Sequence, residues 1–176
     1  MKLDVGCGGS EEFKIHRVRG DVNCDVLKPT CKILNFVQCD AQYLPFKDEA
    51  FEQVMMFDII EHLHSPFKAL KESWRVLKKG GILRLGTPNA LYLPKIISSA
   101  IRGYYIPHKD HIQTWGKPEL ESLLKKTGFN PLVKYETYVD EKKHWFLELL
   151  NKICPFPAIK HRQLYAIAYK MNKNDS

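Results

Sequence analysis

The sequence has no regular cysteine pattern and no long apolar run, and each absence narrows the class of protein. Its five cysteines are an odd number and form no CxxC pair, so they suggest neither a disulfide framework nor a regular zinc motif. No stretch reaches the roughly 18 apolar residues that a membrane span needs. No apolar run follows the start of the chain as it would in a signal peptide. We therefore expect a cytoplasmic protein that makes no membrane contact and binds no metal.

The sequence also lacks internal repeats and low-complexity tracts. Its 176 residues, of which 44% are hydrophobic and 11% aromatic, suit a single folded domain over residues 1–176. The net charge of +7 is uneven. Residues 1–90 hold 13 Lys and Arg against 12 Asp and Glu, whereas residues 91–176 hold 14 against 8. A basic C-terminal half is typical of a solvated Lys-rich surface, and it also leaves nucleic acid open as a partner.

Short apolar runs alternate with helical patterns along the chain. Strands are predicted over residues 1–5, 21–26, 33–40, 51–60, 81–89, 132–139 and 162–171. One helix is predicted from Pro66 through Lys79, ended by Gly80 and Gly81, and another from Pro118, with Gly128 just past its end. Repeated strand, helix and strand indicate an α/β fold with a largely parallel, doubly wound sheet.

Glycines and acids follow the first strands of this predicted sheet. Gly6, Cys7 and Gly8 form a turn directly after the first strand, where backbone can approach a ligand closely. Acids at the ends of the next three strands are Asp25, Asp40 and Asp58. Ligands of such sheets bind at the carboxyl ends of the strands, so these residues predict one binding crevice.

In these ordered motifs the sequence resembles the class I methyltransferases that use S-adenosyl-L-methionine (SAM), in particular the small ubiquinone-biosynthesis-like branch. The resemblance rests on LDVGCGGS, VNCDV, FVQCDAQYLPF, FDIIEHLHSPF and, after the core, HIQTWGKPELESLLKKTGF. It covers about residues 1–130 and implies a Rossmann-like sheet of seven strands. The family's third glycine is Ser10 here, and the usual N-terminal cover helix is expected to be missing.

The resemblance implies a role for each strand end in binding SAM. It assigns Asp4, Gly6, Cys7 and Gly8 to the first motif, which holds the methionine part. It assigns Asp25 to the ribose hydroxyls, with Asp21 as a rival because GDVNCD offers two acids. It places Asp40 and Ala41 at the edge of the adenine. It places Phe57 and Asp58 beside the sulfonium.

The acceptor side is less defined. His62, in the IIEHL stretch, and His111 are the candidate catalytic residues, either to orient the acceptor or to act as a base. The alternative for His62 is a structural hydrogen bond that fixes its turn. Residues 91–116 look like a lid or inserted segment that supplies acceptor specificity.

Three functions remain open at this stage. The leading one is transfer of a methyl group from SAM to a small-molecule acceptor. Methylation of RNA or another nucleic acid comes second. The third is a catalytically silent SAM-binding module that supports a partner chain. We also expect a homodimer, because a missing cover helix would leave apolar surface exposed.

Overall fold

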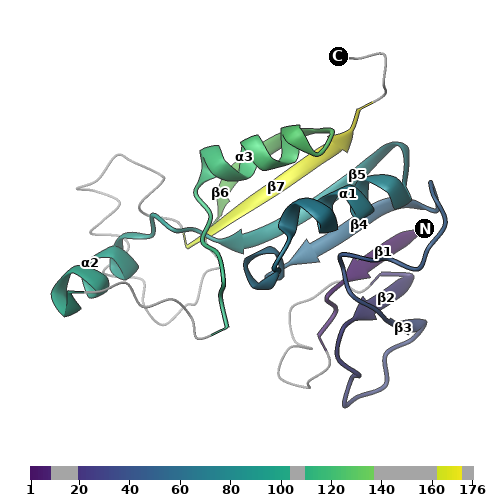
Figure 1. Cartoon of the computed structure of the whole chain (residues 1–176), viewed down its shortest axis with the longest axis horizontal. Coiled ribbons are helices and arrows are strands. Elements are labelled where there is room, and N and C mark those ends of the chain that lie inside the picture. The colour runs from purple at the N-terminus through teal and green to yellow at the C-terminus, as the bar shows by residue number, and fades with distance from the viewer. Residues whose placement is uncertain (9–19, 104–109, 137–161, 172–176) are drawn as a thin grey trace.

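A computed structural model describes residues 1–8, 20–103, 110–136 and 162–171 of the chain (Figure 1). Its strands are β1 (Lys2–Val5), β2 (Val22–Asp25), β3 (Phe36–Gln38), β4 (Phe51–Phe57), β5 (Leu77–Pro88), β6 (Phe129–Glu136) and β7 (Gln163–Lys170). Its helices are α1 (Pro66–Val76), α2 (Leu93–Arg102), α3 (Lys117–Lys126) and a short 3₁₀ helix, η2 (Ile60–His62).

The seven strands form one sheet in the order β3-β2-β1-β4-β5-β7-β6. Strands β1 to β5 are parallel, and β7 runs antiparallel to both β5 and β6. The predicted seven-stranded, mostly parallel sheet is therefore confirmed. The order reverses between β1 and β4, so the carboxyl ends of these two strands flank the place where ligands bind in such sheets.

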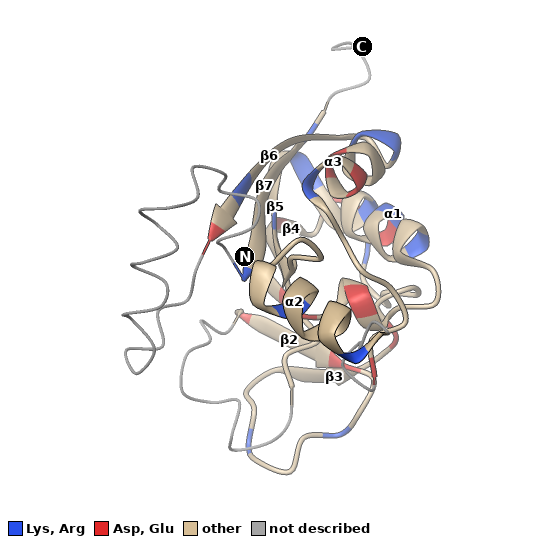
Figure 2. Ribbon diagram, turned by 90° about the vertical axis from the view of Figure 1, so that its left-hand side faces the viewer, with Lys and Arg blue, Asp and Glu red and all other residues tan. Residues whose placement is uncertain are grey.

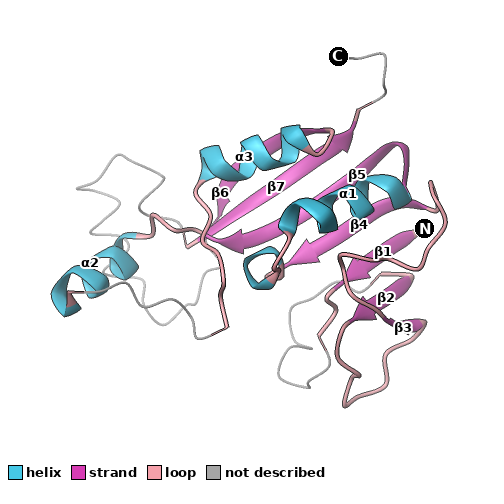
Figure 3. Ribbon diagram, viewed as in Figure 1, coloured by secondary structure: helices cyan, strands magenta, loops and turns pink. Residues whose placement is uncertain are grey.

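Helices α1 and α3 lie on the same face of the sheet (Figures 1 and 3). They cover the buried side chains of the central strands, among them Leu83 and Leu85 of β5 and Leu164 of β7. Residues 9–19 and 137–161 lie outside the described residues, so the expected lack of an N-terminal cover helix stays a prediction. None of the described helices is long and apolar enough to cross a membrane.

The end of α1 differs from the prediction. The helix stops at Val76, and Lys78, Lys79, Gly80 and Gly81 belong to β5 instead of to the helix end. The reason is Leu77, which is fully buried opposite Phe51 of β4. Burying this side chain in the sheet outweighs the helical preference of the two lysines that follow it.

The second half of the fold follows the predicted pattern with shifted boundaries. Helix α3 has Pro118 in its first turn, and Gly128 just after it has a φ of 98°, as a glycine in this place should. Strand β6 begins at Phe129, three residues earlier than predicted. Residues 137–139, predicted as its end, lie outside the described part.

Residues 91–116, predicted as a lid or irregular insertion, contain the helix α2. Pro94 stands in its first turn and Gly103 ends it with a φ of 74°. None of the α2 residues is buried, and the helix stands away from the sheet in Figure 1. Residues 104–109 lie outside the described part, and the mobility of the segment stays a prediction.

The loop between β3 and β4 is held by one side chain of α1. The guanidinium of Arg75 donates to the backbone oxygens of Leu44 and Phe46, at 2.9 and 2.7 Å, and to the carboxylates of Glu72 and Asp48. Glu72 in turn accepts a hydrogen bond from the backbone N–H of Leu44. Arg75 stands near the end of α1 and beside the beginning of β4, so it fixes the part of this loop that leads into β4.

Arg75→Ala should lower the free energy of unfolding by about 2 kcal/mol, because two loop carbonyls lose a charged donor. Lys71→Ala, an exposed position on the same helix, is the control and should cost less than about 0.5 kcal/mol. Urea unfolding followed by circular dichroism measures both. Equal midpoints for the two variants would contradict the assigned role.

Candidate functional site

The glycine turn after β1 is fastened to the end of β2. The backbone N–H groups of Gly6 and Cys7 both donate to the carbonyl of Cys24, at 2.7 and 3.0 Å. Gly6 and Gly8 have φ values of 68° and 65°, which side chains rarely tolerate. A Cβ on Gly6 would also lie 2.0 Å from Cδ1 of Ile59, in the segment after β4. Both glycines are therefore needed for this backbone path.

Asp25 ends β2 beside this turn. One carboxylate oxygen accepts a hydrogen bond from the N–H of Gly8 at 2.9 Å, and the other accepts one from Leu27 at 3.0 Å. A carboxylate has about four acceptor sites, so Asp25 keeps capacity for hydroxyl donors. Val26 and Leu27, directly after it, are apolar and exposed. The arrangement fits a ribose with a flat base next to it.

Asp21, the rival to Asp25, lies at the other end of β2. It precedes the strand and accepts a hydrogen bond from the backbone N–H of Lys2, at the beginning of β1. Because β1 and β2 are parallel, this is the amino-terminal edge of the sheet. Asp21 is therefore not brought together with Gly6 and Gly8, whereas Asp25 is.

Two further predicted cofactor residues follow β3. Asp40 accepts hydrogen bonds from the backbone N–H and the side-chain amide of Gln42, so it also holds its own turn. Ala41 beside it is buried. In β1, Asp4 is fully buried next to the glycine turn. The carboxyl ends of β1, β2 and β3 thus bring together the residues predicted to bind the cofactor.

Phe57 and Asp58 end β4 on the other side of the switch point. Asp58 has a φ of 53°, a strained value for a residue other than glycine, and its N–H donates to Gly86. The ring of Phe57 stacks on that of Tyr165, with centroids 6.1 Å apart. Gly86 lies between them in the sheet, and a Cβ there would come within 2.7 Å of Phe57. The missing side chain makes room for the aromatic pair.

Glu61 is a residue near this site for which the sequence predicted no role. It lies in η2 and is almost fully buried at 1% exposure. One of its carboxylate oxygens accepts a hydrogen bond from the hydroxyl of Thr87 at 2.9 Å. Burial raises the pKa of Glu61 to about 7, and the nearby charge of Asp58 acts in the same direction. A signal was present, since an acid within the apolar run DIIEHL is unusual.

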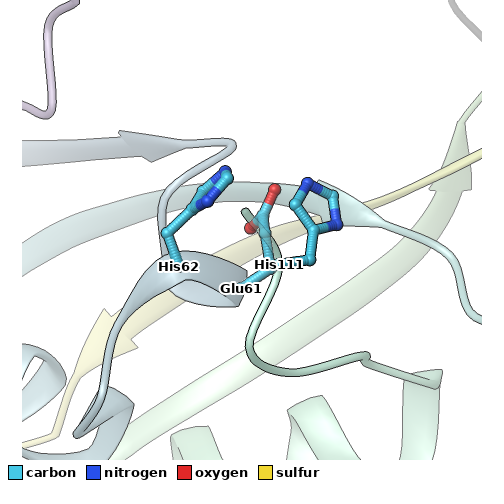
Figure 4. Close-up of side chains that lie close together, drawn as sticks. All are labelled: Glu61, His62 and His111. Atoms are coloured by element: carbon cyan, nitrogen blue, oxygen red, sulfur yellow. The ribbon is translucent and has the colours of Figure 1, made fainter. Parts of the chain in front are cut away.

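His62 and His111 come together although they are 49 positions apart. Their rings meet edge to face with centroids 4.7 Å apart, and Figure 4 shows the carboxylate of Glu61 between them. The backbone N–H groups of Ile112 and Gln113 donate to the carbonyl of Glu61, which fastens the segment of His111 to η2. Nδ1 of His62 lies 2.8 Å from the carbonyl oxygen of Asp110. The structural hydrogen bond considered for His62 is therefore present, and it leaves Nε2 available.

Comparison with known proteins finds a matching family model and several relatives. Residues 3–85 match a model described as a methyltransferase domain. A protein of unknown function from Methanocaldococcus jannaschii is 26% identical over 162 residues, which are 78% of this chain and 64% of that protein. The human "Probable tRNA methyltransferase 9B" is 32% identical over 90 residues, 47% of this chain and 20% of its own length. The ubiquinone/menaquinone C-methyltransferase of Xylella fastidiosa is 35% identical over 94 residues, 48% of this chain and 35% of its own.

Solved structures agree in fold. A SAM-dependent methyltransferase from Archaeoglobus fulgidus aligns with a TM-score of 0.65 and 20% identity, over 97% of this chain and 85% of that one. A chain in the complex between the Haloferax volcanii Trm112 methyltransferase activator and its candidate methyltransferase gives a TM-score of 0.67 at 16% identity, over 97% and 82%. The matched part of the chain spans less than two thirds of the length of each curated relative named above. Residues 3–85 thus match the methyltransferase domain family, and the sheet has the fold of SAM-dependent methyltransferases of known structure.

Proposed function

We propose that this chain transfers a methyl group from SAM to a small-molecule acceptor. The observation that carries the proposal is the joint position of the Gly6–Gly8 turn and Asp25 at neighbouring strand ends. When bound, SAM supplies a methyl group on a positively charged sulfur. The turn, Asp25 and the exposed apolar Val26 and Leu27 fit its polar and flat parts.

The chain's own contribution to such a transfer is alignment of the two reactants. Phe57 and Asp58 stand at the switch point, where a methyl group and an acceptor would meet. Farther along, His62 and His111 face the same region from two different segments. With Nδ1–H donated to Asp110, Nε2 of His62 is the atom that can take a proton from an acceptor hydroxyl.

A small-molecule acceptor is supported by the relatives that are named for quinone methylation. Both basic and acidic residues lie on α1 and α3 (Figure 2). The second candidate is a nucleic acid. It is favoured by the relatives named as tRNA methyltransferases and by the basic C-terminal half of the chain.

Two assembly proposals remain from the sequence. A homodimer is supported by the exposed Ile96, Ile97 and Ile101 of α2, since apolar patches are often covered by partners. A catalytically silent module that supports a partner chain is the other.

Turnover by the purified protein separates such a module from an enzyme. Methyl incorporation from labelled SAM into RNA or into small-molecule fractions of a cell extract separates the two acceptors.

Asp25→Ala should weaken SAM binding by about ten- to a hundredfold, because a carboxylate that accepts two ribose hydroxyls is lost. Asp21→Ala, at the opposite end of the same strand, is the matched control and should bind as the wild type does. Calorimetric titration measures both affinities, and circular dichroism checks that both variants fold. An unchanged affinity of the Asp25 variant, or a loss with the Asp21 variant, would contradict the assignment.

A further inference from the structure

The side chains of Glu61, His62 and His111 are arranged like the ligands of a metal ion. One ligand atom from each lies within 4.8 Å of the other two (Figure 4). Ligand atoms that share a tetrahedral Zn²⁺ ion at about 2.1 Å lie about 3.4 Å apart. Shortening each separation by up to about 1.4 Å, divided between two side chains, would therefore close the site around an ion.

The carboxylate of Glu61 gives a second, independent observation. Its Oε1 atom is buried and accepts no hydrogen bond, although Oε2 accepts one from Thr87. A buried polar atom without a partner costs about 1 to 3 kcal/mol. The carboxylate lies between the two imidazole rings in Figure 4, where a cation would satisfy the unpartnered oxygen.

The hydrogen bond of His62 supports the same conclusion. Its Nδ1–H donates to the carbonyl oxygen of Asp110, which fixes the neutral ring with the lone pair on Nε2. Metal-binding histidines are commonly oriented in this way, with the second nitrogen bonded to a carbonyl or carboxylate. The backbone of the next residues, Ile112 and Gln113, is tied to Glu61, so His111 is held near the same point.

We infer that Glu61, His62 and His111 bind a divalent transition-metal ion, with Zn²⁺ as the best-suited choice. Two imidazole nitrogens and one carboxylate oxygen are ligands that Zn²⁺ accepts, whereas Mg²⁺ prefers oxygen alone. Three protein ligands leave a position open for water or another small oxygen ligand. The sequence analysis expected no metal because the cysteines form no zinc motif, whereas this site uses a carboxylate and two histidines. The inference stands on this geometry alone, and an ion bound to Nε2 of His62 would take the lone pair that is proposed above for the acceptor proton.

The test is Zn²⁺ titration of the full chain after removal of metal with a chelator, followed by calorimetry. We expect the wild type to bind one ion with micromolar or tighter affinity. Glu61→Gln and His111→Gln should each weaken binding about a hundredfold, because each removes a ligand while keeping a similar shape. His64→Gln is the matched control, since this exposed histidine lies two residues beyond His62 and outside the cluster.

Cobalt gives a second readout that does not depend on affinity alone. Co²⁺ in the wild type should show visible absorption of a low-coordinate ion with nitrogen ligands, and the two ligand variants should lose it. Lack of Zn²⁺ binding by the folded wild type, or equal binding by all four proteins, would overturn the inference. SAM binding by the metal-free wild type is measured beside it, so that failure of the metal site and failure of the proposed function are told apart.

Discussion

Gly6→Ala should lower the free energy of unfolding by about 2 to 4 kcal/mol. Two costs add at this position. The backbone has a φ of 68°, which costs about 1 kcal/mol for alanine. The new methyl group would also lie 2.0 Å from Cδ1 and 2.6 Å from Cγ1 of Ile59, and overpacking of this kind costs about 1 to 3 kcal/mol.

Gly80→Ala separates these two costs. Gly80 has nearly the same backbone angle, 71°, but nothing lies within 4 Å of the position of a new Cβ. Its variant should therefore lose only the backbone term of about 1 kcal/mol. Urea unfolding of both variants, with the wild type beside them, gives the difference. Equal losses would mean that Ile59 moves aside without cost, and the contact between the glycine turn and the segment after β4 would then contribute nothing.

The second large effect concerns pH. In metal-free protein kept in a chelator, stability should fall as the pH rises from about 5 to 8. Burial raises the pKa of Glu61 from 4.5 to about 7 in the folded state. Between these values the folded protein holds a proton that the unfolded chain has lost, so rising pH favours unfolding. The full difference corresponds to about 3 kcal/mol.

Glu61→Gln should remove this dependence while keeping an acceptor for the hydroxyl of Thr87. The free energy of unfolding of wild type minus variant, measured at a series of pH values, cancels most contributions of other groups. The titratable groups next to Glu61, namely Asp58, His62 and His111, are present in both proteins. Glu119→Gln, an exposed acid on α3, is the control and should keep the wild-type slope. A slope that Glu61→Gln leaves unchanged would show that Glu61 is charged throughout this range.

The sheet could be predicted from the sequence because its strands carry simple signals. Short apolar runs separated by glycines, prolines and acids mark β1, β2 and β4, and their alternation with helices implies parallel pairing. The end of α1 could not be predicted in this way. Lysines followed by two glycines normally end a helix. Here Leu77 pairs with Phe51 in the sheet, and local sequence does not reveal this tertiary contact.

The closeness of the residues assigned to the cofactor could be predicted, and that of the residues assigned to the acceptor only in part. Gly6, Gly8 and Asp25 each stand at a strand end, so their meeting follows from the order of the strands. His111 reaches η2 through hydrogen bonds from the backbone of the residues after it to Glu61. Side-chain patterns do not encode such backbone contacts, so the trio with Glu61 emerged only from the structure.

Helix α2 has a consequence for how this protein can change. Its ten residues include none that is buried, so the sheet does not depend on their side chains for its stability. Most proteins tolerate few substitutions near a ligand site, because the same residues also hold the core together. Here a segment that follows the carboxyl end of β5 is released from that constraint. Its sequence can drift, or be randomised in a library, while the fold beneath it stays intact.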